Sequence, residues 1–323
     1  MEEANGVVIR GVTAEAGAGA EAGRPPHVAM LVTPGMGHLI PLAELAKRLA
    51  ARHGATATLI TFASTASATQ RAFLASLPPA ITSLSLPPVD LSDLPADATD
   101  DKKEPRAACL DWLDRQPPKS VIFVSFGSGG SLPAEQMREL ALGLEQSGQR
   151  FLWVVRSPSD EGAVNANYYD AESKRDPLPY LPQGFVERTK EVGLLVPSWA
   201  PQIKVLAHEA TGGFLVHCGW NSVLESLAHG VPMVAWPLFA EQRQNAVVLS
   251  EGVGAAVRVP DTKRREEIAA AVREVMAGQG KGAEVRAKVA ELRKAAAAGL
   301  CEGGAATTAL DEVVRKWTGG GDE

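Results

Sequence analysis

The sequence has little of what several protein classes require. Three cysteines occur among 323 residues, with no C-x-x-C pair and no histidine at a zinc-ligand spacing: Cys109, Cys218 and Cys301. This spacing argues against a disulfide framework or a cysteine-based zinc site and favours free thiols in a reducing compartment. We therefore expect a cytoplasmic protein with no metal and no cofactor.

Long apolar runs and an excess of positive charge are also missing. No run of about 18 apolar residues exists, so no transmembrane helix is expected. The formal net charge of −6 offers no attraction to nucleic acid or to anionic membranes. Residues 1–25 are rich in Gly, Ala and Glu and lack the apolar core of a signal peptide, so we expect a disordered tail.

What is present is an alternation of apolar strands and helices. In the range 26–99, three near-continuous or alternating apolar segments predict parallel strands at His27–Thr33, Thr56–Ala63 and Ile81–Leu86. A helical pattern follows the Pro-Gly-Met-Gly turn, and a second helix fits residues 64–75. These elements predict only part of a doubly wound α/β domain.

A Pro- and Asp-rich stretch interrupts the pattern, and we expect residues 100–118 to be a linker. Over 119–323 the alternation resumes and predicts a complete Rossmann-like domain. Its expected strands are Ser120–Phe126, Phe151–Arg156, Gly193–Pro197, Gly212–His217, Pro232–Trp236 and Gly254–Val259.

Small polar groups cluster where one of these strands meets a helix, in VHCGWNSVLES (Val216–Ser226). A helix N-terminus offers unpaired N–H groups and partial positive charge, which suit a phosphate. Glu225 follows on the same helix face and could accept from ribose hydroxyls. An ordinary capped helix explains this stretch alone equally well.

The wider segment WAPQIKVLAHEATGGFLVHCGWNSVLESLAHGVPMVAWPLFAEQ (Trp199–Gln242) resembles the signature segment of plant family 1 UDP-glycosyltransferases. The resemblance implies a GT-B fold, in which two Rossmann-like domains face each other across a cleft. It implies that Trp199 stacks on uracil, that Gln202 contacts the nucleoside and that Glu225 binds the ribose. The resemblance also implies that the diphosphate contacts His217, Asn221 and Ser222, and the sugar contacts Trp220, Glu241 and Gln242.

Two further loops gain meaning from this resemblance. FVSFGSGGSL (Phe123–Leu132) matches a loop that touches the diphosphate in the family, which makes Ser128 a candidate. TPGMGHLIP (Thr33–Pro41) matches the loop that carries the catalytic base, which would be His38. A dinucleotide-binding dehydrogenase is a poor alternative, because Ile40 replaces the third glycine of that fingerprint.

The implied function is inverting O-glucosylation of small phenols or alcohols with UDP-glucose, because a final Gln, here Gln242, is associated with glucose donors. The chain most resembles hydroquinone and monolignol glucosyltransferases, and we expect a monomer. However, half of the first domain has no counterpart, including the Asp that pairs with the base. The Asp cluster near Asp90–Asp101 fits a solvated linker better. A truncated form that binds UDP-sugar without efficient transfer therefore stays open as the alternative.

Overall fold

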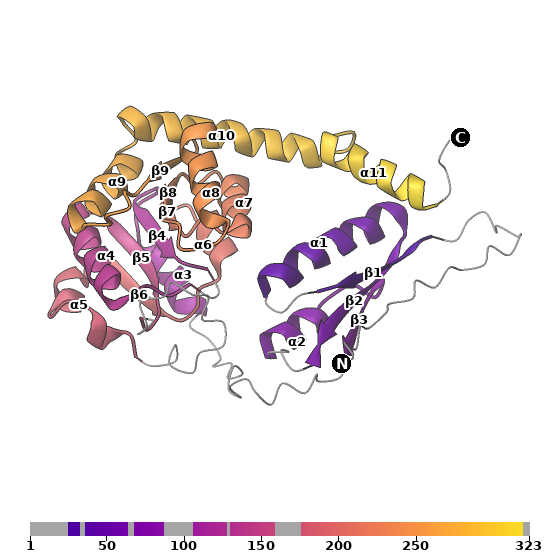
Figure 1. The fold of residues 1–323 in the computed structure, drawn as a ribbon, viewed down its shortest axis with the longest axis horizontal. Coiled ribbons are helices and arrows are strands. Elements are labelled where there is room, and N and C mark those ends of the chain that lie inside the picture. Colours follow the sequence, from indigo (N-terminus) through magenta and orange to yellow (C-terminus); the bar gives the residue numbers. More distant parts are fainter. Residues whose placement is uncertain are drawn as a thin grey trace, which may run out of the picture.

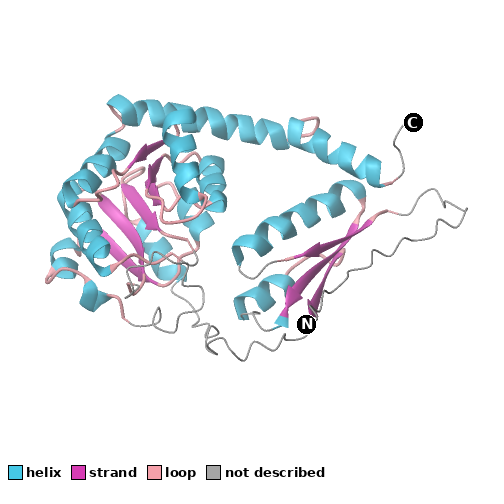
Figure 2. Cartoon of the chain, in the orientation of Figure 1, coloured by secondary structure: helices cyan, strands magenta, loops and turns pink. Residues whose placement is uncertain are grey.

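The computed structural model describes residues 25–32, 36–63, 68–86, 106–127, 130–158 and 176–318. Two separate parallel sheets, magenta in Figure 2, form the centres of two α/β units that lie side by side (Figure 1). The predicted pair of unequal Rossmann-like domains is therefore present. Within the described ranges, no helix is both long and apolar enough to cross a membrane.

The N-terminal unit is a βαβαβ layer with strand order β1-β2-β3. Its elements are β1 (His27–Leu31), α1 (Met36–His53), β2 (Thr56–Phe62), α2 (Ala68–Ala75) and β3 (Ile81–Leu86). The strands match the predicted ones. Helix α1 begins at Met36, inside the stretch expected to form a turn, so Gly37 and His38 lie in its first turn.

The two faces of this sheet differ in burial. Met30, Leu59 and Ile81 are buried in a core shared with α1. On the opposite face Leu31, Ile60 and Leu84 lie in register across the three strands, and Leu31 and Leu84 are 60% and 52% exposed. A doubly wound domain normally covers both faces of a parallel sheet, so this unit is half of such a layer.

The C-terminal domain has a six-stranded parallel sheet of order β6-β5-β4-β7-β8-β9. Its strands are β4 (Val121–Ser125), β5 (Arg150–Val155), β6 (Gly193–Pro197), β7 (Thr211–Val216), β8 (Met233–Ala235) and β9 (Ala256–Arg258), all near the predicted positions. The strand order reverses between β4 and β7, which are neighbours. Ligands bind at such a switch point, outside the carboxyl ends of the strands.

Helices cover both faces of the larger sheet (Figure 1). They are α3 (Arg106–Asp114), α4 (Ala134–Ser147), α5 (Phe185–Thr189), α6 (Gln202–Ala207), α7 (Trp220–His229), α8 (Gln242–Val247), α9 (Arg265–Ala277) and α10 (Gly280–Leu300), with the short helices η3 (Leu178–Tyr180) and η4 (Val248–Gly252), whereas the last helix, α11 (Ala305–Trp317), lies on the N-terminal unit. Their apolar faces and the strands form one core. This core is built around stacked aromatic side chains, among them Phe123 against Phe214.

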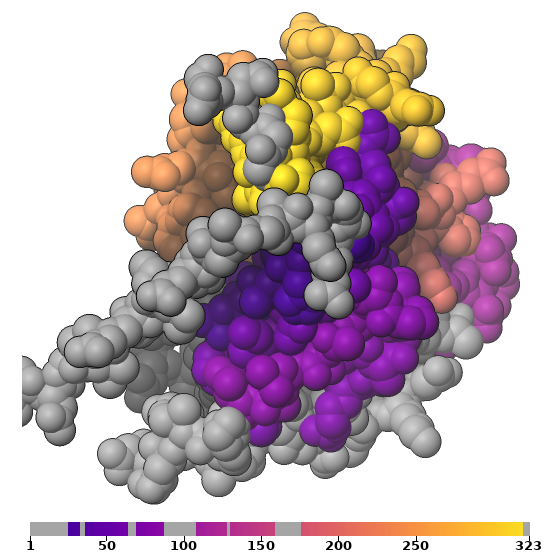
Figure 3. Space-filling model, turned by 90° about the vertical axis from the view of Figure 1, so that its right-hand side faces the viewer, coloured from indigo at the N-terminus to yellow at the C-terminus, as the bar shows by residue number. Residues whose placement is uncertain are grey.

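Two helices pack on a different part of the molecule from the one that the predicted domain boundaries imply. Helix α3 lies inside the expected linker, yet its Cys109 and Leu113 are buried in the C-terminal core. Helix α11, at the far end of the chain, packs on the N-terminal unit, where Val314 joins the smaller core. Figure 3 shows α11 in yellow directly on the indigo and purple N-terminal unit. The two units are thus joined by the chain twice.

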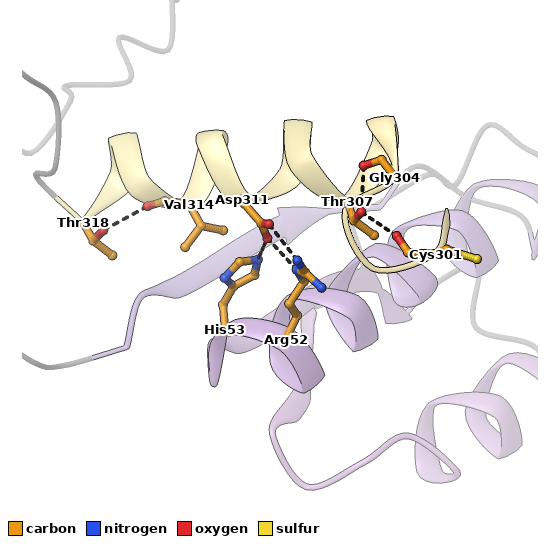
Figure 4. Close-up of polar contacts among 8 residues, drawn as sticks. All are labelled: Arg52, His53, Cys301, Gly304, Thr307, Asp311, Val314 and Thr318. Atoms are coloured by element: carbon orange, nitrogen blue, oxygen red, sulfur yellow. Dashed lines mark hydrogen bonds and ion pairs between the residues drawn. The ribbon is translucent and has the colours of Figure 1, made fainter. Parts of the chain in front are cut away.

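Polar contacts fix α11 on α1 (Figure 4). Asp311 accepts two hydrogen bonds from Arg52, at 2.5 Å from Nε and 2.7 Å from the terminal nitrogen. Nε2 of His53 lies 3.1 Å from the same carboxylate. The Arg52 guanidinium holds the pKa of Asp311 below its usual range. This carboxylate therefore stays charged at neutral pH and keeps its two bonds from Arg52.

Candidate functional site

His217 stands at the centre of the switch point, directly after β7. Its ring lies against two glycines: a Cβ added at Gly127 or at Gly219 would lie only 2.6 Å or 2.3 Å from the imidazole. Burial and, secondarily, the charge of Arg156 lower the pKa of His217 to about 4. At neutral pH the ring is therefore uncharged, with one N–H to donate.

The enclosed side of this ring is unsatisfied. Nδ1 of His217 is buried and has no hydrogen-bond partner among the described residues. The adjacent turn is well held, because Asn245 donates from Nδ2 to the carbonyl of Cys218 at 3.0 Å. Cys218 itself has a φ of 64°, which makes the sharp change of direction between β7 and α7 possible.

Three side chains predicted to bind the nucleoside and the diphosphate meet between α6 and α7. Nε2 of Gln202 donates to Oγ of Ser222 at 3.0 Å and to Oε2 of Glu225 at 2.7 Å. Burial raises the pKa of Glu225, while the bond from Gln202 opposes this shift. The carboxylate is positioned by the amide, and its other oxygen can accept from a diol.

Two tryptophans predicted to contact the donor are exposed at the same edge of the domain. Trp199 follows β6 and is 43% exposed, and Trp220 opens α7 and is 52% exposed. Their exposure suits stacking on a base or a sugar, as the sequence predicts.

The predicted sugar-binding pair lies at the start of α8. Gln242 is buried, and its Oε1 accepts hydrogen bonds from the N–H groups of Leu238 at 3.0 Å and Phe239 at 3.2 Å. Its oxygen is thus used to hold the preceding turn, which leaves the amide nitrogen to donate to a ligand. Glu241 is exposed at the N-cap of α8.

A contact between the units brings the predicted base near the donor site. Pro41 has no N–H, so the carbonyl of Gly37, four residues earlier in α1, lacks its normal helical donor. Nδ2 of Asn221, in the first turn of α7, donates to that carbonyl instead. His38 is the next residue after Gly37 and is exposed. The first turns of α1 and α7 therefore face each other.

Some of the predicted site residues lie outside the described ranges. Ser128 and the Asp cluster at Asp90–Asp101 are outside the described residues. Among those described, no three His, Cys, Asp or Glu side chains are placed to hold a metal ion.

Arg156, at the end of β5, is part of the site but was not predicted. Its only sequence signal is a basic residue at the end of an apolar strand, which does not identify a binding site.

Comparisons with known proteins agree with this geometry. The model of the family "UDP-glucoronosyl and UDP-glucosyl transferase" matches residues 96–286. UDP-glycosyltransferase 72B1 of Arabidopsis thaliana is 55% identical over 221 residues, 67% of this chain and 45% of that protein. Hydroquinone glucosyltransferase of Rauvolfia serpentina is 54% identical over 213 residues, 65% of this chain and 45% of its own length.

Solved structures are similar over both units. One is the UGT2 protein of Phytolacca americana in complex with UDP-2-fluoro-glucose and pterostilbene, with a TM-score of 0.76 and 31% identity, covering 91% of this chain and 100% of that chain. This similarity confirms the predicted GT-B type fold. The chain nevertheless spans only about 45% of the length of the curated relatives named above.

The matched range contains β4 to β9 and every described donor-site side chain, whereas the predicted base His38 lies before it. On sequence and on fold, this chain belongs to the family of UDP-glucoronosyl and UDP-glucosyl transferases.

Proposed function

We propose that the chain transfers glucose from UDP-glucose to a small phenolic or alcohol acceptor, with inversion at the anomeric carbon. The observation that carries this proposal is the group Gln202, Ser222 and Glu225 beside the neutral His217 at the switch point. This arrangement offers donors to a diphosphate and a positioned carboxylate to a ribose. The names of the relatives support a phenolic acceptor.

In the proposed reaction, His38 takes the proton of the acceptor hydroxyl as its oxygen attacks the anomeric carbon. The bond from that carbon to the diphosphate breaks, and UDP leaves with both bonding electrons. The N-terminus of α7, with His217 and Ser222, stabilises the developing charge. Trp199 stacks on uracil, and Trp220, Glu241 and Gln242 hold the sugar. Ser128 is a further candidate for the diphosphate.

The alternative is a protein that binds UDP-sugar with little or no transfer. The observation that favours it is the N-terminal unit, which has three strands and one exposed sheet face. An acceptor pocket needs walls that such a unit supplies only in part. A monomer in the cytoplasm, with no metal and no cofactor, completes the proposal and remains a prediction.

Two measurements on the purified chain test the proposal. Calorimetry with UDP tests the donor site, and release of UDP from UDP-glucose, with and without simple phenols, tests transfer. We expect phenol-dependent release that falls about 10²- to 10⁴-fold in His38→Ala, because a general base contributes that much. His27→Ala, in the same unit but on the exposed face of its sheet, is the matched control.

The outcomes separate the two candidates. UDP binding with phenol-dependent release supports the glucosyltransferase. UDP binding without release supports the donor-binding alternative, and absence of UDP binding by the folded chain rejects both.

A further inference from the structure

We propose that Arg156 is a positioning residue of the donor site, which fastens the loop after β4 to the loop after β6. The inference rests on the proposed function, because it assumes that these two loops hold the diphosphate and the uracil of one donor. In this inference, the Arg156 side chain sets the distance between the loop after β4 and the loop after β6.

The position of Arg156 follows from the strand order. Strand β5 lies between β6 and β4 in the sheet, so a side chain at its carboxyl end can reach the loops on both sides. Toward β4, one terminal nitrogen of the guanidinium donates to the carbonyl of Gly127 and, at 3.1 Å, to that of Gly130. Toward β6, Nε and the other terminal nitrogen donate to the carbonyl of Ser198 at 3.2 Å and 2.9 Å.

Both tethered loops have backbone that needs such support. Gly127 has a φ of 76° and Ser198 a φ of 65°, and the left-handed region is unfavourable for a serine. Ser198 directly precedes Trp199, so the tether fixes the backbone that carries the indole. Gly127 lies against the His217 ring, so the same guanidinium also fixes one wall of the imidazole site.

The charge of Arg156 acts in the same place. It contributes to the lowered pKa of His217, after burial. The guanidinium therefore supplies a permanent positive charge beside a histidine that stays neutral, and anions are attracted through its field while its N–H groups bind carbonyls. Geometry and charge can be separated by substitution, because lysine keeps the charge but lacks the planar fork that serves two loops.

The test compares Arg156→Met and Arg156→Lys with Arg188→Met. Arg188 is a matched control, because its guanidinium also bridges two elements, donating to Glu145 at 2.5 Å and 2.9 Å and to the carbonyl of Gln183 at 2.8 Å, neither of which is a predicted donor residue. UDP affinity is measured by calorimetry, uridine affinity by ligand-observed NMR, folding by circular dichroism, and the protonation of His217 by NMR of labelled histidine.

We expect Arg156→Met to lower UDP affinity about 10- to 100-fold, since hydrogen bonds from a charged donor are lost. Uridine affinity falls as well, because the Trp199 backbone is released. The His217 titration moves up toward its ordinary range in Arg156→Met and stays low in Arg156→Lys, a difference that a merely structural role does not produce. Arg156→Lys nevertheless loses uridine affinity, while Arg188→Met changes none of these values.

The inference is overturned if folded Arg156→Lys binds uridine and UDP as the unchanged chain does. It is also overturned if the variants lose thermal stability alone, with both affinities intact. If Arg156→Met does not fold, the Lys variant still decides. Failure of the unchanged chain to bind UDP rejects the proposed function instead, so the two failures are distinguishable.

Discussion

At the scale of single residues, the donor site depends on the absence of a side chain at Gly219. Its φ of −63° suits any residue, so what requires glycine there is space. A Cβ would lie 2.3 Å from Nε2 of His217, and that ring also lies against Gly127. We expect Gly219→Ala to lower the free energy of unfolding by about 1–3 kcal/mol, as overpacking does, and to weaken UDP binding.

Chemical denaturation and calorimetry measure both effects. Gly252→Ala is the control, because a Cβ there meets nothing within 4 Å. Equal stability and equal UDP affinity in the two alanine variants would show that the His217 ring can move aside.

The neutrality of His217 predicts a pH dependence of stability. The folded protein protonates this ring only near pH 4, whereas in the unfolded chain it titrates near its ordinary value of 6.5. As pH falls from 6.5 to about 4, the unfolded state binds a proton that the folded state does not bind, so the free energy of unfolding falls. The full effect is up to about 3 kcal/mol, at 1.36 kcal/mol per unit of pKa difference.

The substitution His217→Gln removes this group and keeps an amide donor. We expect the loss of stability between pH 7 and pH 4.5, measured by urea unfolding at each pH, to be smaller in the variant. An identical loss in both proteins would mean that other groups alone produce the acid sensitivity.

At the scale of elements, α11 is the piece that closes the N-terminal unit. Val314 is buried with Met30 and Leu59, whereas its neighbour Val313 is 40% exposed. Val314→Ala removes the equivalent of two methylenes from this core, so we expect a loss of about 1–2 kcal/mol confined to the N-terminal unit. Val313→Ala is the matched control, and protease sensitivity of β1 to β3 is the measurement.

The strands were predictable because a strand buried on both faces reads as a continuous apolar run, as in β4 and β7. The first turn of α1 was not, because Gly37 and Pro41 both argue against helix locally. Nor could the sequence show that α3 packs on the C-terminal domain and α11 on the N-terminal unit. An amphipathic pattern identifies an apolar face but not its partner, and Val314 finds its partner more than 200 residues earlier in the chain.

The candidate site divides in the same way. The segment around His217 was predictable, since small polar residues between a strand and a helix are typical of anion sites. Arg156 was not predictable, because in sequence it only ends an apolar strand. Its role depends on β5 lying between β4 and β6, which is a property of the sheet order.

At the scale of the whole molecule, the two units have unequal protection from water. Every residue of β4 and β7 is buried, whereas β3 is exposed at Thr82 to Ser85. Local opening requires less free energy where fewer apolar contacts are lost. We therefore expect the amides of β1 and β3 to exchange with deuterium at least about tenfold faster than those of β4 and β7, which corresponds to about 1.4 kcal/mol in opening free energy.

Adding UDP makes this measurement a test of how the units communicate. The ligand is expected to protect α6 and α7, because it binds only the folded donor site. The Asn221 contact to Gly37 then predicts added protection in the first turn of α1, but none in β3, which has no such contact among the described residues. Protection of α7 alone would show that the contact does not couple the units. Equal protection of β3 and β7 without ligand would show that the exposed face of the smaller sheet costs the unit no stability.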